Sequence, residues 1–87
     1  MKKALLKMVK SIIQNPKDVD FEIIKRLLEQ FGYSCRQPKK GSSHYVFRKD
    51  GIYPITFPKN KPVKTVYVKE IIKILDLRSW YEENKND

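Results

Sequence analysis

The dipeptide Asp50-Gly51 is the strongest hairpin signal in the chain, and it constrains the fold more than any other feature. The segments on either side of it, residues 42–49 and 52–57, are rich in the β-branched and aromatic side chains that strands favour. Two antiparallel strands joined by a tight turn are therefore predicted. The second strand contains Pro54, which cannot donate to a ladder, so it belongs at a sheet edge or carries a bulge.

A further strand and a helix are predicted before the hairpin. Residues 33–37 form the strand, and the turn at residues 38–41 joins it to the hairpin. Asp20 is a favoured N-cap for the helix, and Gly32 is its expected C-terminal stop. Helical spacing places five side chains on the buried stripe, namely Phe21, Ile24, Leu27, Leu28 and Phe31.

Two more helices are predicted, one on each side of this unit. Residues 1–14 form a basic amphipathic helix that ends before Asn15-Pro16. After a basic loop at residues 58–64, Thr65 is expected to cap a final helix. The many β-branched residues there leave a strand at Val66–Val68 as the alternative. The apolar positions of the final helix are Val68, Ile71, Ile72 and Leu75.

The order of elements predicts an α+β fold for one domain spanning residues 1–87, with helices on one face of a three-stranded antiparallel sheet. Residues 20–77 have the α-β-β-β-α order of a double-stranded-RNA-binding domain, to which the first helix is an addition. Residues 78–87 are polar and expected to fray, although Trp80 and Tyr81 have the character to pack back on the domain.

Composition narrows the possible classes of protein. The 87 residues suffice for one small core, and 40% of them are hydrophobic. The sequence has no run of about 18 apolar residues, which excludes a membrane-spanning helix. Lys7 and Lys10 interrupt the apolar residues near the N-terminus, so a signal peptide is not expected. The single cysteine, Cys35, excludes an internal disulfide and suits a small strand side chain in a reducing cytoplasm.

Positive charge is concentrated in the middle of the chain. The sequence has 19 Lys and Arg residues against 10 Asp and Glu residues, a formal net charge of +9. Residues 36–64 hold eight of these bases and a single acid, Asp50, so the segment carries +7. Such a block favours a polyanionic partner, because each neutralised phosphate releases condensed counterions. A solvated surface that keeps the protein soluble is the alternative.

Residues 41–48, which read Gly-Ser-Ser-His-Tyr-Val-Phe-Arg, concentrate the reactive groups. Alternation along a strand places His44, Val46 and Arg48 on one face. The small residues before His44 allow close approach of a nucleotide backbone, and Arg48 has the geometry to hold a phosphate. Imidazole is the usual group for moving a ribose 2′-hydroxyl proton at neutral pH. A strand histidine with no chemical role is the alternative.

Segments across residues 21–77 also follow a known pattern. They are the helix end at residues 27–33, the strand at 41–48, the segment 55–58 with its basic continuation, and residues 64–75. Together they resemble the HicA family of type II toxin–antitoxin systems, whose members are ribosome-independent mRNA interferases with a fold similar to that of double-stranded-RNA-binding domains. Two departures stand out. This chain has one serine more than the Gly-Ser-His motif, and it lacks the histidine that many relatives carry after the proline of the third strand.

The resemblance implies a metal-independent mRNA endoribonuclease in which His44 is the catalytic acid or base, with no cofactor. The sequence has no Gly-rich phosphate loop, no pair of histidines and no spaced acidic cluster for a metal. The implied partners are mRNA and a cognate HicB-type antitoxin, with no membrane, and DNA is contacted only through the antitoxin complex. The candidate RNA-binding residues are Lys39, Lys40, Ser42, Ser43, Arg48, Lys59 and Lys61.

Three other interpretations stay open. The missing second histidine favours a non-catalytic RNA-binding module with the same fold. The basic block would also suit a protein–protein module that docks an acidic partner. A basic amphipathic helix such as residues 1–14 is, finally, able to lie on an anionic membrane.

Overall fold

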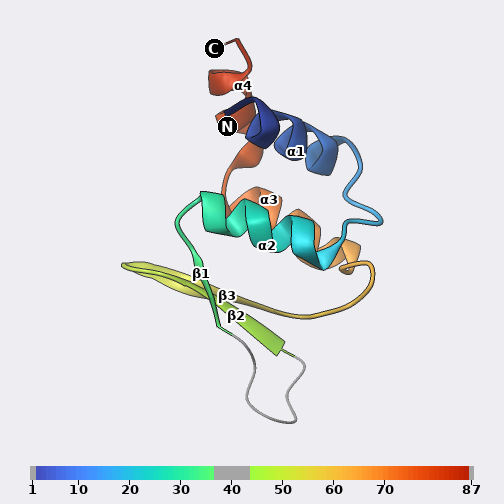
Figure 1. Cartoon of the computed structure of the whole chain (residues 1–87), viewed down its shortest axis with the longest axis vertical. Coiled ribbons are helices and arrows are strands. Elements are labelled where there is room, and N and C mark those ends of the chain that lie inside the picture. Colours follow the sequence, from blue (N-terminus) through green and yellow to red (C-terminus); the bar gives the residue numbers. More distant parts are fainter. Residues whose placement is uncertain (1, 37–43, 87) are drawn as a thin grey trace.

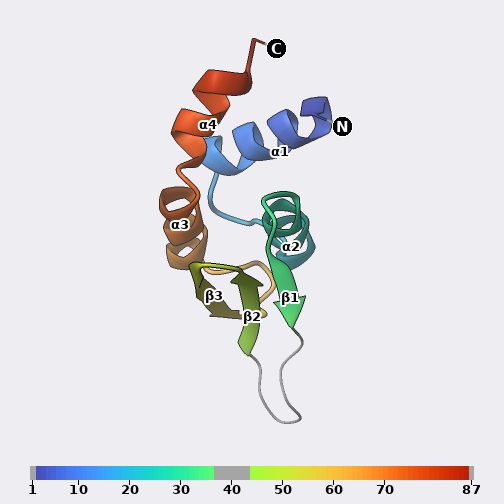
Figure 2. The ribbon, with the colours of Figure 1, turned by 90° about the vertical axis from the view of Figure 1, so that its left-hand side faces the viewer.

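The computed structural model describes residues 2–36 and 44–86. It has three layers (Figures 1 and 2): the sheet, then α2 and α3 on one of its faces, and then α1 and α4 beyond these helices. This confirms the predicted α+β class and the three-stranded antiparallel sheet. The elements in chain order are α1 (Lys2–Gln14), α2 (Phe21–Gln30), β1 (Ser34–Arg36), β2 (His44–Lys49), β3 (Ile52–Pro58), α3 (Thr65–Ile74) and α4 (Leu77–Asn84).

The sheet has the order β1-β2-β3, and both pairs of strands are antiparallel. Phe47 is central, since it lies opposite Cys35 on one side and Ile55 on the other. The register shifts between Phe47 and Lys49, beside the hairpin turn. Pro54 is exposed on β3, which is an edge strand, so the prediction made from this proline is confirmed.

An aromatic cluster joins the sheet to α2. The Phe21 ring, in the first turn of α2, lies 4.8 Å from the Tyr45 ring and 5.8 Å from the Phe57 ring, centroid to centroid. Phe47 and Phe57 stack on neighbouring strands with their centroids 5.3 Å apart and their planes 7° apart. Tyr45 and Phe47 thus face the helices, and the residues that alternate with them face away.

The C-terminus of α2 ends in a hydrogen-bonded cap that requires glycine. Gly32 has φ +93°, its N–H donates to the Glu29 carbonyl, and the Tyr33 N–H donates to the Leu28 carbonyl. This is the Schellman arrangement, and it confirms Gly32 as the predicted stop. The Lys49 ammonium adds a further bond to the Phe31 carbonyl at 2.8 Å. Lys49, one of the eight bases of residues 36–64, therefore helps to cap the C-terminus of α2.

The apolar side of α1 packs against the core of the protein. Val9 and Ile12 are 0% and 2% exposed, and Leu5, Met8 and Ile13 pack against the same core. These are the side chains that would have to enter a membrane if α1 lay on one. No helix in the described part of the chain is long and apolar enough to cross a membrane.

The C-terminal quarter differs from the sequence expectation in two places. Residues 65–74 are helical, so the alternative of a strand at Val66–Val68 is wrong, and the N-cap is Lys64 instead of Thr65. The segment expected to fray is helical from Leu77 to Asn84. Leu77 is fully buried, and Trp80 and Tyr81 pack on the core. Their i, i+3, i+4 spacing gives even this polar segment an apolar stripe.

Some strand limits also differ. The first strand was expected over residues 33–37, and β1 covers Ser34–Arg36, while β3 extends one residue beyond its predicted end, to Pro58. Residues 37–43, which include the predicted turn at 38–41 and the start of the second strand at Ser42, lie outside the described part of the chain.

Truncation of Phe47 should destabilise the protein much more than truncation of its exposed neighbour. Phe47 is fully buried and Tyr53 is 91% exposed. We expect Phe47→Ala to lower the free energy of unfolding by about 3–5 kcal/mol, and Tyr53→Ala by no more than about 0.5 kcal/mol. Urea unfolding followed by circular dichroism measures both. Equal losses would contradict the described packing of the sheet.

The single tryptophan reports on α4. Trp80 is half-buried, and its ring lies 5.5 Å from the Phe31 ring in an edge-on arrangement. We expect its fluorescence to be less accessible to iodide in the native protein than in urea, and Phe31→Ala to raise that accessibility without unfolding the chain. Native quenching equal to that in urea would show that α4 is not docked.

Candidate functional site

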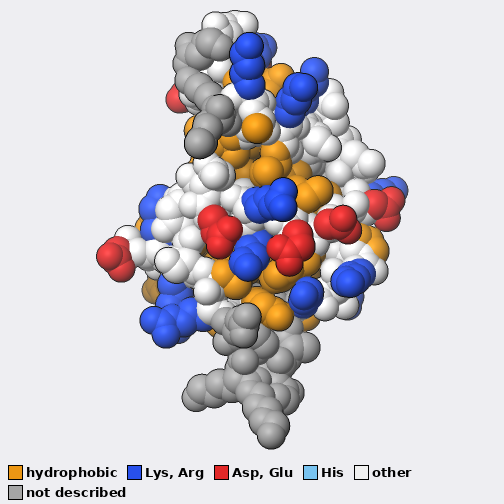
Figure 3. Space-filling view, viewed as in Figure 1, with side chains coloured by type: hydrophobic (Ala, Val, Ile, Leu, Met, Phe, Trp, Pro, Cys, Tyr) orange, Lys and Arg blue, Asp and Glu red, His pale blue; other side chains and the backbone are white. Residues whose placement is uncertain are grey.

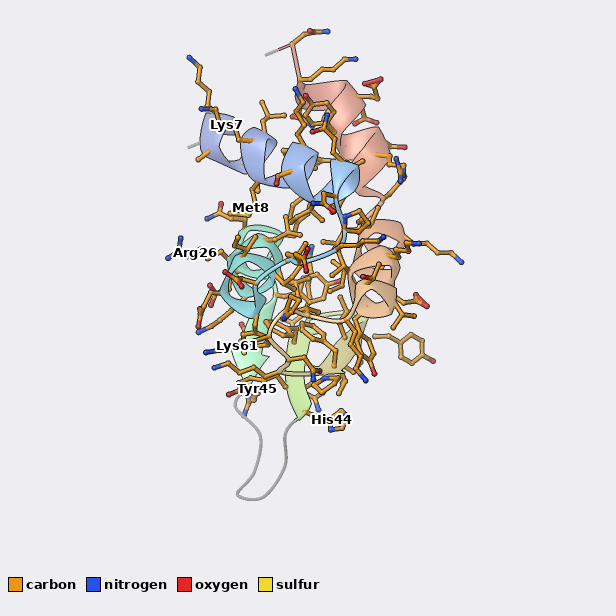
Figure 4. The ribbon with its side chains drawn as sticks, turned by 90° about the vertical axis from the view of Figure 1, so that its right-hand side faces the viewer. Lys7, Met8, Arg26, His44, Tyr45 and Lys61 are labelled. Carbon is orange, nitrogen blue, oxygen red and sulfur yellow. The ribbon has the colours of Figure 1, made fainter. Side chains whose placement is uncertain are left out.

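His44 is the first residue of β2, and its Cα pairs with that of Pro58 on β3. The side chain is exposed. Because Tyr45 and Phe47 point toward the helices, alternation directs His44 to the opposite face of the sheet. Figure 4 shows the imidazole at the foot of β2, pointing away from the helical layers.

Two arginines share this outer face with His44. Arg48 lies two residues further along β2, so it has the same orientation as His44. Arg36 of β1 pairs with Val46, and Ser34 pairs with Arg48. Arg36 and Arg48 are thus diagonal neighbours across two strands, at a spacing of roughly 7–8 Å. Both side chains are exposed, and none of the three described strands contains Asp or Glu.

Arg36 was missed as a candidate by the sequence analysis. Its position on the face of His44 follows from the pairing of Cys35 with Phe47. A sequence pattern predicts that a strand alternates, but it does not fix the register between strands that are joined by a long connection. The sequence does show that Ser34 and Arg36 alternate with Cys35. This alternation places Arg36 on the face of His44 only once the pairing of Cys35 with the buried Phe47 is known.

Lys59 follows Pro58, the strand partner of His44, but its ammonium and Lys61 lie by side chains on the opposite, helix-facing side of the sheet. The Lys59 ammonium lies 5.4 Å from the centroid of the Phe21 ring and 5.9 Å from that of Tyr45, and both rings belong to the helix-facing side. Lys59 and Lys61 line a cavity of about 260 Å³ at the start of α2, together with the carboxylates of Asp20 and Glu22. Figure 4 shows Lys61 and Tyr45 on this side of the sheet.

Four of the predicted RNA-binding residues lie outside the described part of the chain. They are Lys39, Lys40, Ser42 and Ser43. All four lie within the five residues that precede His44 in the sequence.

The cysteine is not part of this face. Cys35 alternates with Ser34 and Arg36, so its half-buried side chain is directed to the helices. Burial raises the pKa of the Cys35 thiol, and nearby Lys25 lowers it by less. The thiol is therefore protonated at neutral pH and is a poor nucleophile. Within residues 2–36 and 44–86, no three His, Cys, Asp or Glu side chains gather in a way that would hold a metal ion.

The outer face of the sheet therefore offers an exposed imidazole beside two guanidinium groups. Guanidinium groups bind phosphate through paired N–H donors, and an imidazole is able to take or give a proton. Such a face suits a phosphodiester.

Comparison with protein families gives one finding. A family model described as HicA toxin of bacterial toxin–antitoxin systems matches residues 22–77, which contain α2 except for Phe21, the strands β1 to β3, and α3. No curated protein and no solved structure matches the chain. The matched region covers more than half of the 87 residues. The chain belongs to the HicA toxin family of bacterial toxin–antitoxin systems.

Proposed function

We propose that this toxin is a metal-independent mRNA endoribonuclease and that His44 carries its chemistry. The observation that supports this most is the position of His44, exposed on the one sheet face that also presents Arg36 and Arg48. His44 is the only histidine in the sequence. It therefore either both removes the 2′-hydroxyl proton and protonates the leaving 5′-oxygen, or it does the first and another group does the second. Membership of the family places the protein among toxins.

In the proposed reaction, the His44 imidazole removes the proton of a ribose 2′-hydroxyl. The 2′-oxygen attacks the adjacent phosphorus, and the bond from phosphorus to the 5′-oxygen breaks. The leaving oxygen takes a proton from His44, from water or from another side chain, which balances the step. The products are a 2′,3′-cyclic phosphate and a 5′-hydroxyl end. Arg48 stabilises the charge that develops on the phosphoryl oxygens.

The other basic residues hold the RNA strand in this proposal. Arg36 extends the phosphate-binding face beyond Arg48, and Lys39, Lys40, Ser42 and Ser43 adjoin His44 along the chain. Lys59 and Lys61 lie on the helix-facing side of the sheet. They would contact the RNA only where it passes the end of the sheet at which His44 lies.

A non-catalytic RNA-binding module is the second candidate. It is favoured by the single histidine, because a second imidazole would have supplied the acid for the leaving group. The two candidates share the arginine face and differ only in whether His44 changes the rate of RNA cleavage. The family implies a cognate antitoxin. We propose a HicB-type partner, a cytoplasmic location with mRNA as target, and contact with DNA only through the antitoxin complex.

Replacement of His44 by glutamine tests the catalytic role. Glutamine keeps hydrogen-bonding groups but transfers no proton, so cleavage of end-labelled RNA in EDTA should fall by at least about 100-fold. Lys69→Gln, an exposed change on α3, is the matched control and should keep wild-type activity. Circular dichroism establishes that both variants are folded.

Each result of this assay decides between the two candidates. Loss of cleavage in the folded His44→Gln protein supports catalysis by His44. Wild-type cleavage by the same variant would remove His44 from the mechanism. No cleavage by folded wild-type protein would favour the RNA-binding module.

Removal of the two arginines should weaken RNA binding in a way that depends on salt. Each phosphate contact to single-stranded RNA adds about −0.7 to the slope of log affinity against log salt. The double change of Arg36→Gln and Arg48→Gln should therefore make this slope shallower by about 1.4. Lys69→Gln with Lys73→Gln removes the same charge from α3 and should leave the slope nearly unchanged. Equal effects of the two pairs would show that only net charge matters.

A further inference from the structure

A groove of about 440 Å³ lies between α1 and α2, far from His44. Figure 4 shows Met8 between the two helices and His44 at the other end of the molecule. We call it the α1–α2 groove. The residues of the two helices that line it are Ala4, Lys7, Met8, Ser11 and Ile12 of α1 and Ile23 and Arg26 of α2.

The floor of the α1–α2 groove is apolar. Ile12 and Val19 are buried beneath it, at 2% and 6% exposure. Met8 is half-buried, and Ile23 is 38% exposed, so both offer apolar surface to a ligand. Figure 3 shows apolar side chains between α1 and α2. Methionine is flexible and adapts to the shape of a bound apolar group.

The rim of the groove is mainly basic. Lys7 of α1, Lys17 of the connecting segment and Arg26 of α2 surround it, and Asp18 is the one acid in the lining. No ion pair joins any of these four side chains to another residue in the described part of the chain. Three cations around an apolar floor are complementary to a segment that carries both carboxylates and apolar side chains.

The groove is long enough for a short segment. From Ala4 of α1 to Asn15, the residue that follows the helix, this wall spans eleven residue steps, or about 16 Å at about 1.5 Å per step. A neighbouring cavity of about 220 Å³ shares Ala4, Met8 and Arg26 with the groove, and its further lining is Leu5, Gln30 and the acidic Glu29. An acidic helix of three turns would fit alongside α1.

This groove depends on an element outside the shared family region. The family match begins at residue 22, whereas α1 covers Lys2–Gln14. Removing α1 would take away one wall and leave Ile23 and Arg26 on an open surface of α2. The groove is therefore a feature that α1 adds to the domain containing His44.

We propose that the α1–α2 groove is a docking site for an acidic, amphipathic polypeptide segment of a partner protein. The observation that favours a polypeptide over RNA is the lining. Bases bind non-specifically by stacking on aromatic rings, and the described lining of both cavities contains no aromatic side chain. The apolar floor is complementary to leucine or isoleucine side chains, and the three cations are complementary to carboxylates.

The experiment uses ¹⁵N-labelled full-length protein and a synthetic peptide. The peptide has about eleven residues, enough to follow the α1 wall, with leucine at helical i, i+3, i+4 spacing and glutamate elsewhere. Addition should shift the amide signals of Ala4, Met8, Ile23 and Arg26, while those of β2 stay in place. A peptide with lysine in place of glutamate should produce none of these shifts.

The matched variants separate this site from general charge. Lys7→Glu with Arg26→Glu should weaken binding of the acidic peptide at least about 10-fold, which corresponds to about 1.4 kcal/mol. Lys69→Glu with Lys73→Glu makes the same charge change in another hollow of about 420 Å³ and should change binding less than about 2-fold. Circular dichroism establishes that both variants are folded.

Three outcomes would overturn the proposal. One is the absence of shifts at the groove with about 1 mM peptide, which would place any affinity below a useful range. Another is equal weakening by both variant pairs. The third is that 2′-O-methyl oligouridine, which the proposed chemistry cannot cleave, shifts the groove residues, since that would make the groove an RNA surface. The readout is binding alone, so each outcome is independent of ribonuclease activity.

Discussion

The packing of Phe21 against the sheet decides which face of the strands remains open. Its ring lies 4.8 Å from Tyr45 and 5.8 Å from Phe57, in the first turn of α2. Because strand residues alternate, burial of Tyr45 and Phe47 under α2 directs His44 and Arg48 outward. A slip of one residue in β2 would exchange the two sets and bury an imidazole and a guanidinium among aromatic rings. The cost of burying these polar groups fixes the register, and the register determines where the proposed chemistry takes place.

Much of this arrangement was predictable from local sequence signals. The Asp50-Gly51 turn, the stop at Gly32 and the edge position of Pro54 each follow from backbone geometry that few residues satisfy. The grouping of His44 with Arg48 follows from strand periodicity alone. These features depend on a few neighbouring residues, which is why a single sequence was sufficient to predict them.

Three features that the sequence did not predict depend on distant contacts. The helix α4 is polar, and its short stripe is stabilised by packing of Trp80 against Phe31, 49 residues earlier in the chain. Arg36 joins the His44 face only through the register of β1 with β2. Lys59 was a candidate RNA-binding residue, and its ammonium lies over the Phe21 and Tyr45 rings, an attraction that sequence spacing does not reveal.

In the proposed reaction, the sheet face around His44 holds a ribose 2′-hydroxyl against the adjacent phosphate without a metal ion. The most direct test is an RNA oligonucleotide in which the nucleotide on the 5′ side of a mapped cleavage site carries a single 2′-deoxyribose. In EDTA, we expect wild-type protein to cut the all-ribose strand to 2′,3′-cyclic phosphate ends and to leave the substituted linkage intact. Cleavage of the 2′-deoxy linkage, or products that end in a 3′-hydroxyl, would contradict it.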